Sequence, residues 1–128
     1  MAAITIGGAK YVDRVAEVIS LSFATLPLTT YTFRQPDSTW PANDVPFDVV
    51  WPVYRENIGR KAAAGAELAE AGDFAAVAIW FPPGVAVPES PDVAPRMLEY
   101  REVFSRMKKD HLRGASWWRV ERGLLYMA

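Results

Sequence analysis

One short stretch of the chain places an acid and a base next to each other. Asp110 precedes His111, which is the only histidine of the 128 residues. A carboxylate beside an imidazole is a pair that can transfer a proton near neutral pH. Arg119 and Tyr126 follow, and a guanidinium or a phenol can polarise or protonate a carbonyl group. We therefore predict catalytic roles for His111, Asp110, Arg119 and Tyr126; a solvated helix end and surface charges are the alternative interpretation.

Aromatic side chains are frequent, and several lie in loops or in adjacent pairs. The chain has five Trp, five Tyr and six Phe. Such side chains bury area in cores, but they also line ligand pockets. Where two of them are adjacent on a strand, they point to opposite faces. With core packing as the alternative, we predict a binding site for an apolar or aromatic small molecule from Tyr31, Phe33, Trp40, Tyr54, Trp80, Phe81, Trp117 and Trp118.

Composition excludes several classes of function. The chain has no cysteine, one histidine and a formal net charge of −1 at pH 7. Thiolate catalysis, cysteine-based zinc sites and histidine-based metal sites are therefore excluded. A nearly neutral chain has no electrostatic attraction to nucleic acid or to an anionic membrane. The first residues do not resemble a signal peptide, and no apolar run has membrane-spanning length. We expect a cytoplasmic protein with no metal, no cofactor, and no nucleic-acid or membrane partner.

The spacing of apolar residues predicts the elements that position these groups. An apolar face at helical spacing predicts helices, and short runs rich in Val, Ile and Trp predict strands. The double proline Pro82-Pro83 has no N–H for a sheet, so the strand before it must end there. In chain order we predict strand Ala3–Ile6, helix Tyr11–Leu26, an irregular stretch Thr29–Val45, helix Phe47–Ala71, strand Phe74–Phe81, a helix that carries Met97 and His111 and ends at Gly114, and strand Trp117–Val120.

These elements form an α/β arrangement in a single domain, residues 1–128. Because neither face of Phe74–Phe81 is polar, we expect this strand in the interior of the sheet. The stretch Thr29–Val45 carries three large aromatic side chains that are costly to leave in water. It therefore reads either as a cover over a pocket or as a plain surface loop.

Three stretches resemble the GCN5-related N-acetyltransferase (GNAT) superfamily, in the branch common in fungi and bacteria. Ser22–Leu28, followed by Tyr31, is similar to the pattern AF…DPL…Y at the end of that branch's first helix. Ala76–Gly84 reads AVAIWFPPG and is similar to the branch's VAVWLPPG strand. The helix Met97–His111 and the Trp-rich strand after it resemble the segment that leads into the family's HWYL strand.

The resemblance runs from about Ile4 to Trp118 and implies a GNAT-like fold. In that family the Trp-rich strand is followed by a loop of the form R/Q-x-x-G-x-G/A, which holds the acyl-CoA pyrophosphate at a helix start. Only Arg122-Gly123 echoes this loop here. We therefore expect a truncated GNAT-like fold that keeps the N-terminal, acceptor-binding half, with a small, mainly antiparallel sheet of about three to four strands packed with three helices.

This resemblance implies a GNAT-derived enzyme or binding domain that uses its acceptor cleft in small-molecule biosynthesis, for a cyclisation, an isomerisation or a proton transfer. A first alternative is an N-acetyltransferase fragment that needs a complementary chain to bind acetyl-CoA. A second is a non-catalytic interaction module. Because an unpaired strand edge invites pairing with another chain, we also expect a homodimer through the C-terminal strand, with contacts near Trp117, Trp118, Leu124, Leu125 and Tyr126.

Overall fold

The computed structural model describes residues 3–89 and 94–111. The chain divides into two units, Met1–Met97 and Leu98–Ala128, and each is described by itself. The predicted strand Trp117–Val120 lies outside the described residues. The prediction of a single domain over residues 1–128 stays a prediction.

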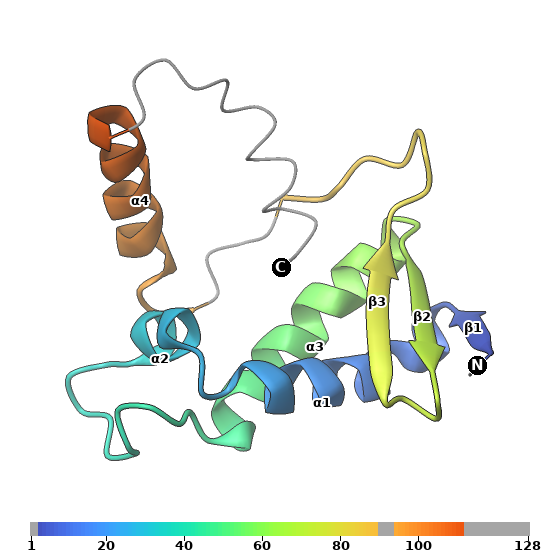
Figure 1. The fold of residues 1–128 in the computed structure, drawn as a ribbon, viewed down its shortest axis with the longest axis horizontal. Helices are drawn as coiled ribbons and strands as arrows, with labels where there is room; N and C mark the ends of the chain where they lie inside the picture. The colour runs from blue at the N-terminus through green and yellow to red at the C-terminus, as the bar shows by residue number, and fades with distance from the viewer. Residues whose placement is uncertain (1–2, 90–93, 112–128) are drawn as a thin grey trace. The chain divides into compact units, whose positions relative to one another are not determined.

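The first unit contains a three-stranded antiparallel sheet (Figure 1). Its strands are β1 (Ile4–Gly7), β2 (Glu67–Ala71) and β3 (Ala76–Trp80). β2 lies in the middle and pairs with both neighbours, Ala69 standing opposite Ile6 on one side and Ala78 on the other. The predicted α/β class with a small antiparallel sheet is confirmed.

A carboxylate holds the tight turn between β2 and β3. Asp73 and Phe74 both have positive φ, a conformation that residues other than glycine rarely adopt. The carboxylate of Glu70 accepts a hydrogen bond of 3.0 Å from the backbone N–H of Phe74 and another from the hydroxyl of Thr5 on β1. These two hydrogen bonds lower the pKa of Glu70, the one from Thr5 having the larger effect. Glu70, on the central strand, thus joins the β2–β3 turn to β1.

Four α-helices and one short 3₁₀ helix occur among the described residues. The 3₁₀ helix, η1, leads directly into the first α-helix. Pro52 lies inside the third α-helix, where it has no N–H to donate to the carbonyl of Asp48 four residues earlier. In chain order the helices are η1 (Ala9–Tyr11), α1 (Val12–Phe23), α2 (Pro27–Phe33), α3 (Phe47–Ala63) and α4 (Met97–His111).

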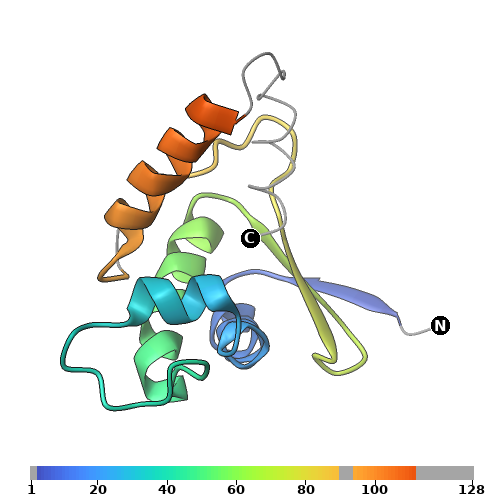
Figure 2. The same cartoon turned by 60° about the vertical axis from the view of Figure 1, so that its left-hand side comes forward.

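The main core of the first unit lies where α1 passes between α3 and the sheet (Figure 2). Val15 and Ala16 of α1, Ile58 of α3 and Leu68 of β2 are fully or almost fully buried there. On β3, Val77 and Ile79 face the same cluster. Alternating residues of the strands therefore supply one apolar face against α1.

A second core cluster lies between α2, α3 and the loop that joins them. Phe33, Val45, Val50 and Ala94 are buried in it, and Trp40 packs against it from the loop. The backbone N–H of Val45 donates to the carbonyl of Ala24, which ties the end of this loop to the α1–α2 connection. The loop thus covers one side of the second cluster.

The prediction that Thr29–Val45 is irregular is wrong for its first residues, which belong to α2. Leu26 is extended and Pro27 occupies the first helical turn, so α2 begins at this proline. The hydroxyls of Thr30 and Thr32 donate to backbone carbonyls three or four residues earlier. These bonds satisfy the buried hydroxyls, and the burial of Phe33 stabilises a short helix that threonine propensity alone disfavours.

The prediction of one helix over Phe47–Ala71 is wrong beyond Ala63. Ala64 caps α3, and Gly65 follows with a φ of 105°, a conformation that ends a helix and suits glycine. The next residues form β2, which pairs on both sides with other strands. Cross-strand pairing therefore overrides the helix propensity of the Ala- and Glu-rich sequence Glu67–Ala71.

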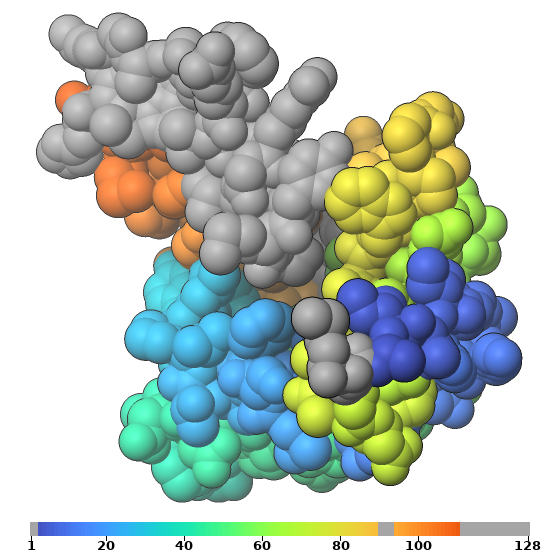
Figure 3. All heavy atoms as spheres, turned by 45° about the vertical axis from the view of Figure 1, so that its right-hand side comes forward, coloured from blue at the N-terminus to red at the C-terminus, as the bar shows by residue number. Residues whose placement is uncertain are grey.

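The outer face of the sheet is apolar and exposed, although neither face of β3 is polar. The expected position of this strand in the interior of the sheet stays a prediction. Trp80 is 58% exposed, and on β1 Ile4 and Ile6 are 72% and 60% exposed. Figure 3 shows β1 in dark blue and the β2–β3 hairpin in yellow-green to yellow at the surface of this unit. Among the described residues, β3 pairs only with β2.

The core assignment predicts unequal effects of two leucine truncations. Leu68 is 0% exposed in the main core, whereas Leu21 on α1 is 62% exposed. Leu68→Ala should lower the free energy of unfolding by about 2–5 kcal/mol, because it removes buried methyl groups and leaves a cavity. Leu21→Ala should change it by about 0.5 kcal/mol or less. Urea unfolding followed by circular dichroism measures both, and equal effects would contradict this core.

Candidate functional site

Four of the predicted binding residues lie around α2, and we call Tyr31, Phe33, Trp40 and Tyr54 the α2 cluster. Tyr31 and Phe33 belong to α2, Trp40 to the following loop and Tyr54 to α3. The rings of Phe33 and Tyr54 are 6.2 Å apart, and Trp40 packs against the same core cluster. Phe33 is only 5% exposed, whereas Tyr31 and Trp40 are half-buried. Phe33 and Tyr54 therefore form a base against which Trp40 packs, and Tyr31 is a second half-buried aromatic side chain on α2.

Tyr54 is held from several sides. Its ring lies 6.5 Å from that of Phe23 on α1, in addition to its contact with Phe33. Burial raises the pKa of the Tyr54 hydroxyl, and a hydrogen bond with the side chain of Thr29 opposes this rise in part. A neutral phenol with a satisfied hydroxyl is suited to support the cluster.

Two arginines that the sequence did not single out complete this region. The guanidinium of Arg34 lies 4.8 Å from the centre of a Trp40 ring, and that of Arg96 lies 3.9 Å from the centre of the Tyr31 ring. Such stacking is a favourable cation–π arrangement. Tyr31 and Arg34 are three residues apart, a spacing that makes two residues neighbours only on a helix. Because the sequence did not predict a helix here, it did not indicate Arg34 as part of this region.

Trp80 and Phe81 lie elsewhere in the first unit. Trp80 faces outward on β3, on the side of the sheet away from α1, and Phe81 follows it directly. The structure therefore does not bring Trp80 together with the α2 cluster. Its role in binding stays a prediction.

The predicted catalytic residues lie at the end of α4 or beyond it. Asp110 is exposed in the last turn of α4, and His111 is the last residue of that helix, with a side chain outside the described part. Arg119, Tyr126, Trp117 and Trp118 lie outside the described residues, as does the predicted homodimer contact. These assignments stay predictions.

Lys61 is a further titratable group that the sequence reasoning missed. It lies in the last turn of α3 and is half-buried, and this burial lowers its pKa. From the sequence, a lysine in the last turn of a helix is interpreted as a solvated charge that interacts favourably with the helix dipole. Its burial, and hence its lowered pKa, depends on tertiary packing and could not be predicted.

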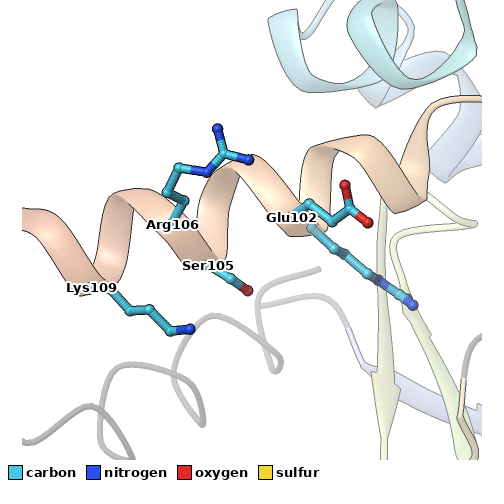
Figure 4. A pocket seen from close by; sticks show the side chains of 5 residues that line it. Glu102, Ser105, Arg106 and Lys109 are labelled. Atoms are coloured by element: carbon cyan, nitrogen blue, oxygen red, sulfur yellow. The ribbon is translucent and has the colours of Figure 1, made fainter.

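The hollow found in the described second unit runs along α4 (Figure 4). The predicted binding residues that the structure describes do not line it. Its walls carry mainly charged side chains, namely Arg101, Glu102, Ser105, Arg106 and Lys109. Over the described ranges, no group of three potential metal ligands occurs, and no helix has the length and apolar character needed to cross a membrane.

Comparison with known families decides the ancestry of this arrangement. A family model described as the YOR012W acetyl transferase domain matches residues 9–86. The chain belongs to this family. The match spans α1, α2, α3 and the β2–β3 hairpin, so it includes the whole α2 cluster and Arg34. It confirms an acetyltransferase-related domain and the resemblance to the N-terminal half of the GNAT fold. Searches of curated proteins and of solved structures gave no match.

The described residues do not fit the acyl-CoA loop of acetyltransferases. In the described part of the chain, the glycine pair Gly7-Gly8 precedes the helix η1. A Cβ at Gly7 would lie 2.6 Å from the Tyr11 ring, so the space that this glycine leaves is filled by the chain's own side chain. Tyr11 also donates its backbone N–H to Gly8. No phosphate cradle exists at this helix start.

The raised pKa of Tyr54 predicts a pH dependence of stability. In the unfolded chain the hydroxyl ionises near its ordinary pKa of 10.0, whereas in the folded protein it keeps its proton to a higher pH. The stability that Tyr54 contributes is therefore complete below this value and is lost as the pH rises through the folded-state pKa. Tyr54→Phe should remove this part of the decline, although it also removes the hydroxyl that bonds Thr29.

Urea unfolding at pH values between about 9 and about 11 measures this difference. Tyr100→Phe on α4 is the control, and its free energy of unfolding should decline with pH as that of the unsubstituted protein does. If Tyr54→Phe showed the same decline as the control, burial of the Tyr54 hydroxyl would not govern its ionisation.

Proposed function

We propose that the chain binds a small apolar or aromatic molecule at the α2 cluster. The observation that carries the proposal is that Tyr31 and Trp40 are half-buried aromatic side chains, Trp40 packing against the core cluster that contains Phe33 and Tyr54. Aromatic side chains fixed at the edge of a core offer a ligand a rigid apolar surface at low entropic cost. All four residues lie within the matched acetyltransferase region.

The buried members of the cluster have a supporting role in this proposal. Phe33 is almost fully buried, and the Tyr54 hydroxyl is engaged by Thr29. They set the positions of Tyr31 and Trp40, which make the contacts to the ligand. In the loop from Arg34 to Pro46, Trp40 would contact the ligand, and the buried Val45 holds the loop against the second core cluster.

Two reactions are compatible with such a binding domain. A conversion without an acyl donor, namely a cyclisation, isomerisation or proton transfer in small-molecule biosynthesis, needs a binding surface for the substrate and polar groups of the chain itself. Acetyl transfer completed by a complementary chain is supported by the family match. We propose the first reaction, with His111, Asp110, Arg119 and Tyr126 as its catalytic groups, in a homodimer formed through the C-terminal strand.

Truncation of Trp40 tests the binding proposal. A set of aromatic small molecules is screened by ligand-observed NMR, and the tightest binder is titrated by calorimetry. Trp40→Ala should raise its Kd by about tenfold, because a lost aromatic contact is worth about 1.5 kcal/mol. Leu21→Ala, which removes an exposed side chain of α1, should leave the Kd unchanged. Equal affinity of Trp40→Ala and the unsubstituted protein, or no binder in the whole set, would refute the proposal.

The same binder separates the two reactions. It is incubated with the purified protein with and without acetyl-CoA, and the products are identified by mass spectrometry. Conversion to an isomer without acetyl-CoA supports the first reaction. An acetylated product, or heat from acetyl-CoA titrated into the purified chain, would overturn it in favour of acetyl transfer.

A further inference from the structure

Two guanidinium groups are fixed at the surface of the α2 cluster by more than their ring contacts. The Nη1 of Arg34 donates a hydrogen bond of 3.1 Å to the carbonyl of Trp40, the residue on whose ring it stacks. The backbone N–H of Arg96 donates to the carbonyl of Thr32 at 2.9 Å, which places its side chain over Tyr31. Both arginines are half-buried. Their positions are therefore set by the backbone of α2 and its loop.

Both arginines are tied to the C-terminal end of α2. Tyr31 lies three residues before Arg34, which caps this helix. Arg96 covers Tyr31, and its backbone N–H donates to the carbonyl of Thr32 in the same turn. The carbonyl groups at a helix C-terminus favour cations and offset part of the repulsion between the two charges.

A third stacked arginine shows a different pattern. Arg55 lies 5.5 Å from the centre of the Trp51 ring, and its Nε also binds the carboxylate of Asp13 at 2.6 Å. By contrast, the side chain of Arg34 donates its hydrogen bond to a neutral acceptor, the backbone carbonyl of Trp40. A guanidinium has five N–H donors in a planar fork that matches a carboxylate, so Arg34 can also bind an anion from outside the chain.

We propose that Arg34 and Arg96 bind the carboxylate of a small molecule whose apolar or aromatic part contacts Tyr31 and Trp40. This inference rests on the proposed binding function and names its substrate class: a carboxylic acid with an apolar or aromatic body. The rings fix the planes of the two guanidinium groups, so that their N–H edges meet the carboxylate oxygens while the ligand body lies against aromatic surface. Recognition of this kind is selective for the charged acid over its neutral amide.

Pairs of compounds that differ only in this group test the inference. The probes are 3-phenylpropanoate and 3-phenylpropanamide, indole-3-acetate and indole-3-acetamide, and 4-methylpentanoate and 4-methylpentanamide. Each is titrated into the purified protein by calorimetry. For at least one pair the acid should bind about tenfold or more tightly than the amide, as expected for a charge-assisted bidentate contact. Its affinity should also fall as salt is added.

Substitutions assign the preference to the two arginines. Arg34→Gln and Arg96→Gln should each reduce the preference for the acid to about twofold or less while the amide keeps its affinity. Arg34→Lys, which keeps the charge but not the planar fork, should retain an intermediate preference. Arg55→Gln is the matched control, a stacked arginine that already binds Asp13, and it should leave the preference unchanged. Circular dichroism melts show that each variant folds.

The outcomes separate the inference from the proposed function. Equal binding of acid and amide, with Trp40→Ala still weakening both, would overturn the carboxylate assignment and leave the binding function intact. An acid preference that survives in Arg34→Gln and Arg96→Gln would also overturn it. If no compound of the six bound, both the inference and the proposed function would fall.

Discussion

The candidate site depends on the packing of Tyr54 against both core clusters of the first unit. Tyr54 packs against the main core, and its ring also lies 6.2 Å from that of Phe33 in the second. Its hydroxyl bonds Thr29 of α2. One side chain of α3 thus fixes the short helix α2 relative to α1, although a seven-residue helix has little stability of its own. The half-buried aromatic and basic groups at the surface of α2 owe their positions to this contact.

Sequence periodicity predicted the long elements well and missed those that depend on tertiary contacts. Met97 and His111 lie on the predicted helix α4, and the apolar faces of α1 and of the first part of α3 were recognised. The two errors have a common cause. The sequence of β2 has helix propensity but is paired on both sides with other strands, and α2 is rich in threonine but is stabilised by buried contacts. In both places packing overrides local propensity.

The candidate site was predictable in its aromatic part only. Tyr31, Phe33 and Trp40 stood out because large aromatic side chains in a loop must pack against something. Phe33 and Trp40 belong to the second core cluster, and Arg96 covers the Tyr31 ring. Arg34 and Arg96 did not stand out, since a charged residue beside a loop reads as solvated unless the fold shows it stacked on a ring. Trp80 was grouped with the others by residue type, yet strand alternation turns it to the outer face of the sheet. The family match covers α2 and the loop after it, and it therefore includes Tyr31, Phe33 and Trp40.

The central claim is that a ligand binds at the α2 cluster and not at the outer sheet face or along α4. The most direct measurement is a map of amide and indole chemical-shift changes in a ¹⁵N-labelled protein titrated with the tightest aromatic binder. The account predicts that the largest changes occur at Tyr31, Arg34, Trp40 and Arg96, including the Trp40 indole N–H. If the largest changes instead fell on Trp80 and its strand, or on α4, the α2 cluster would not be the binding site.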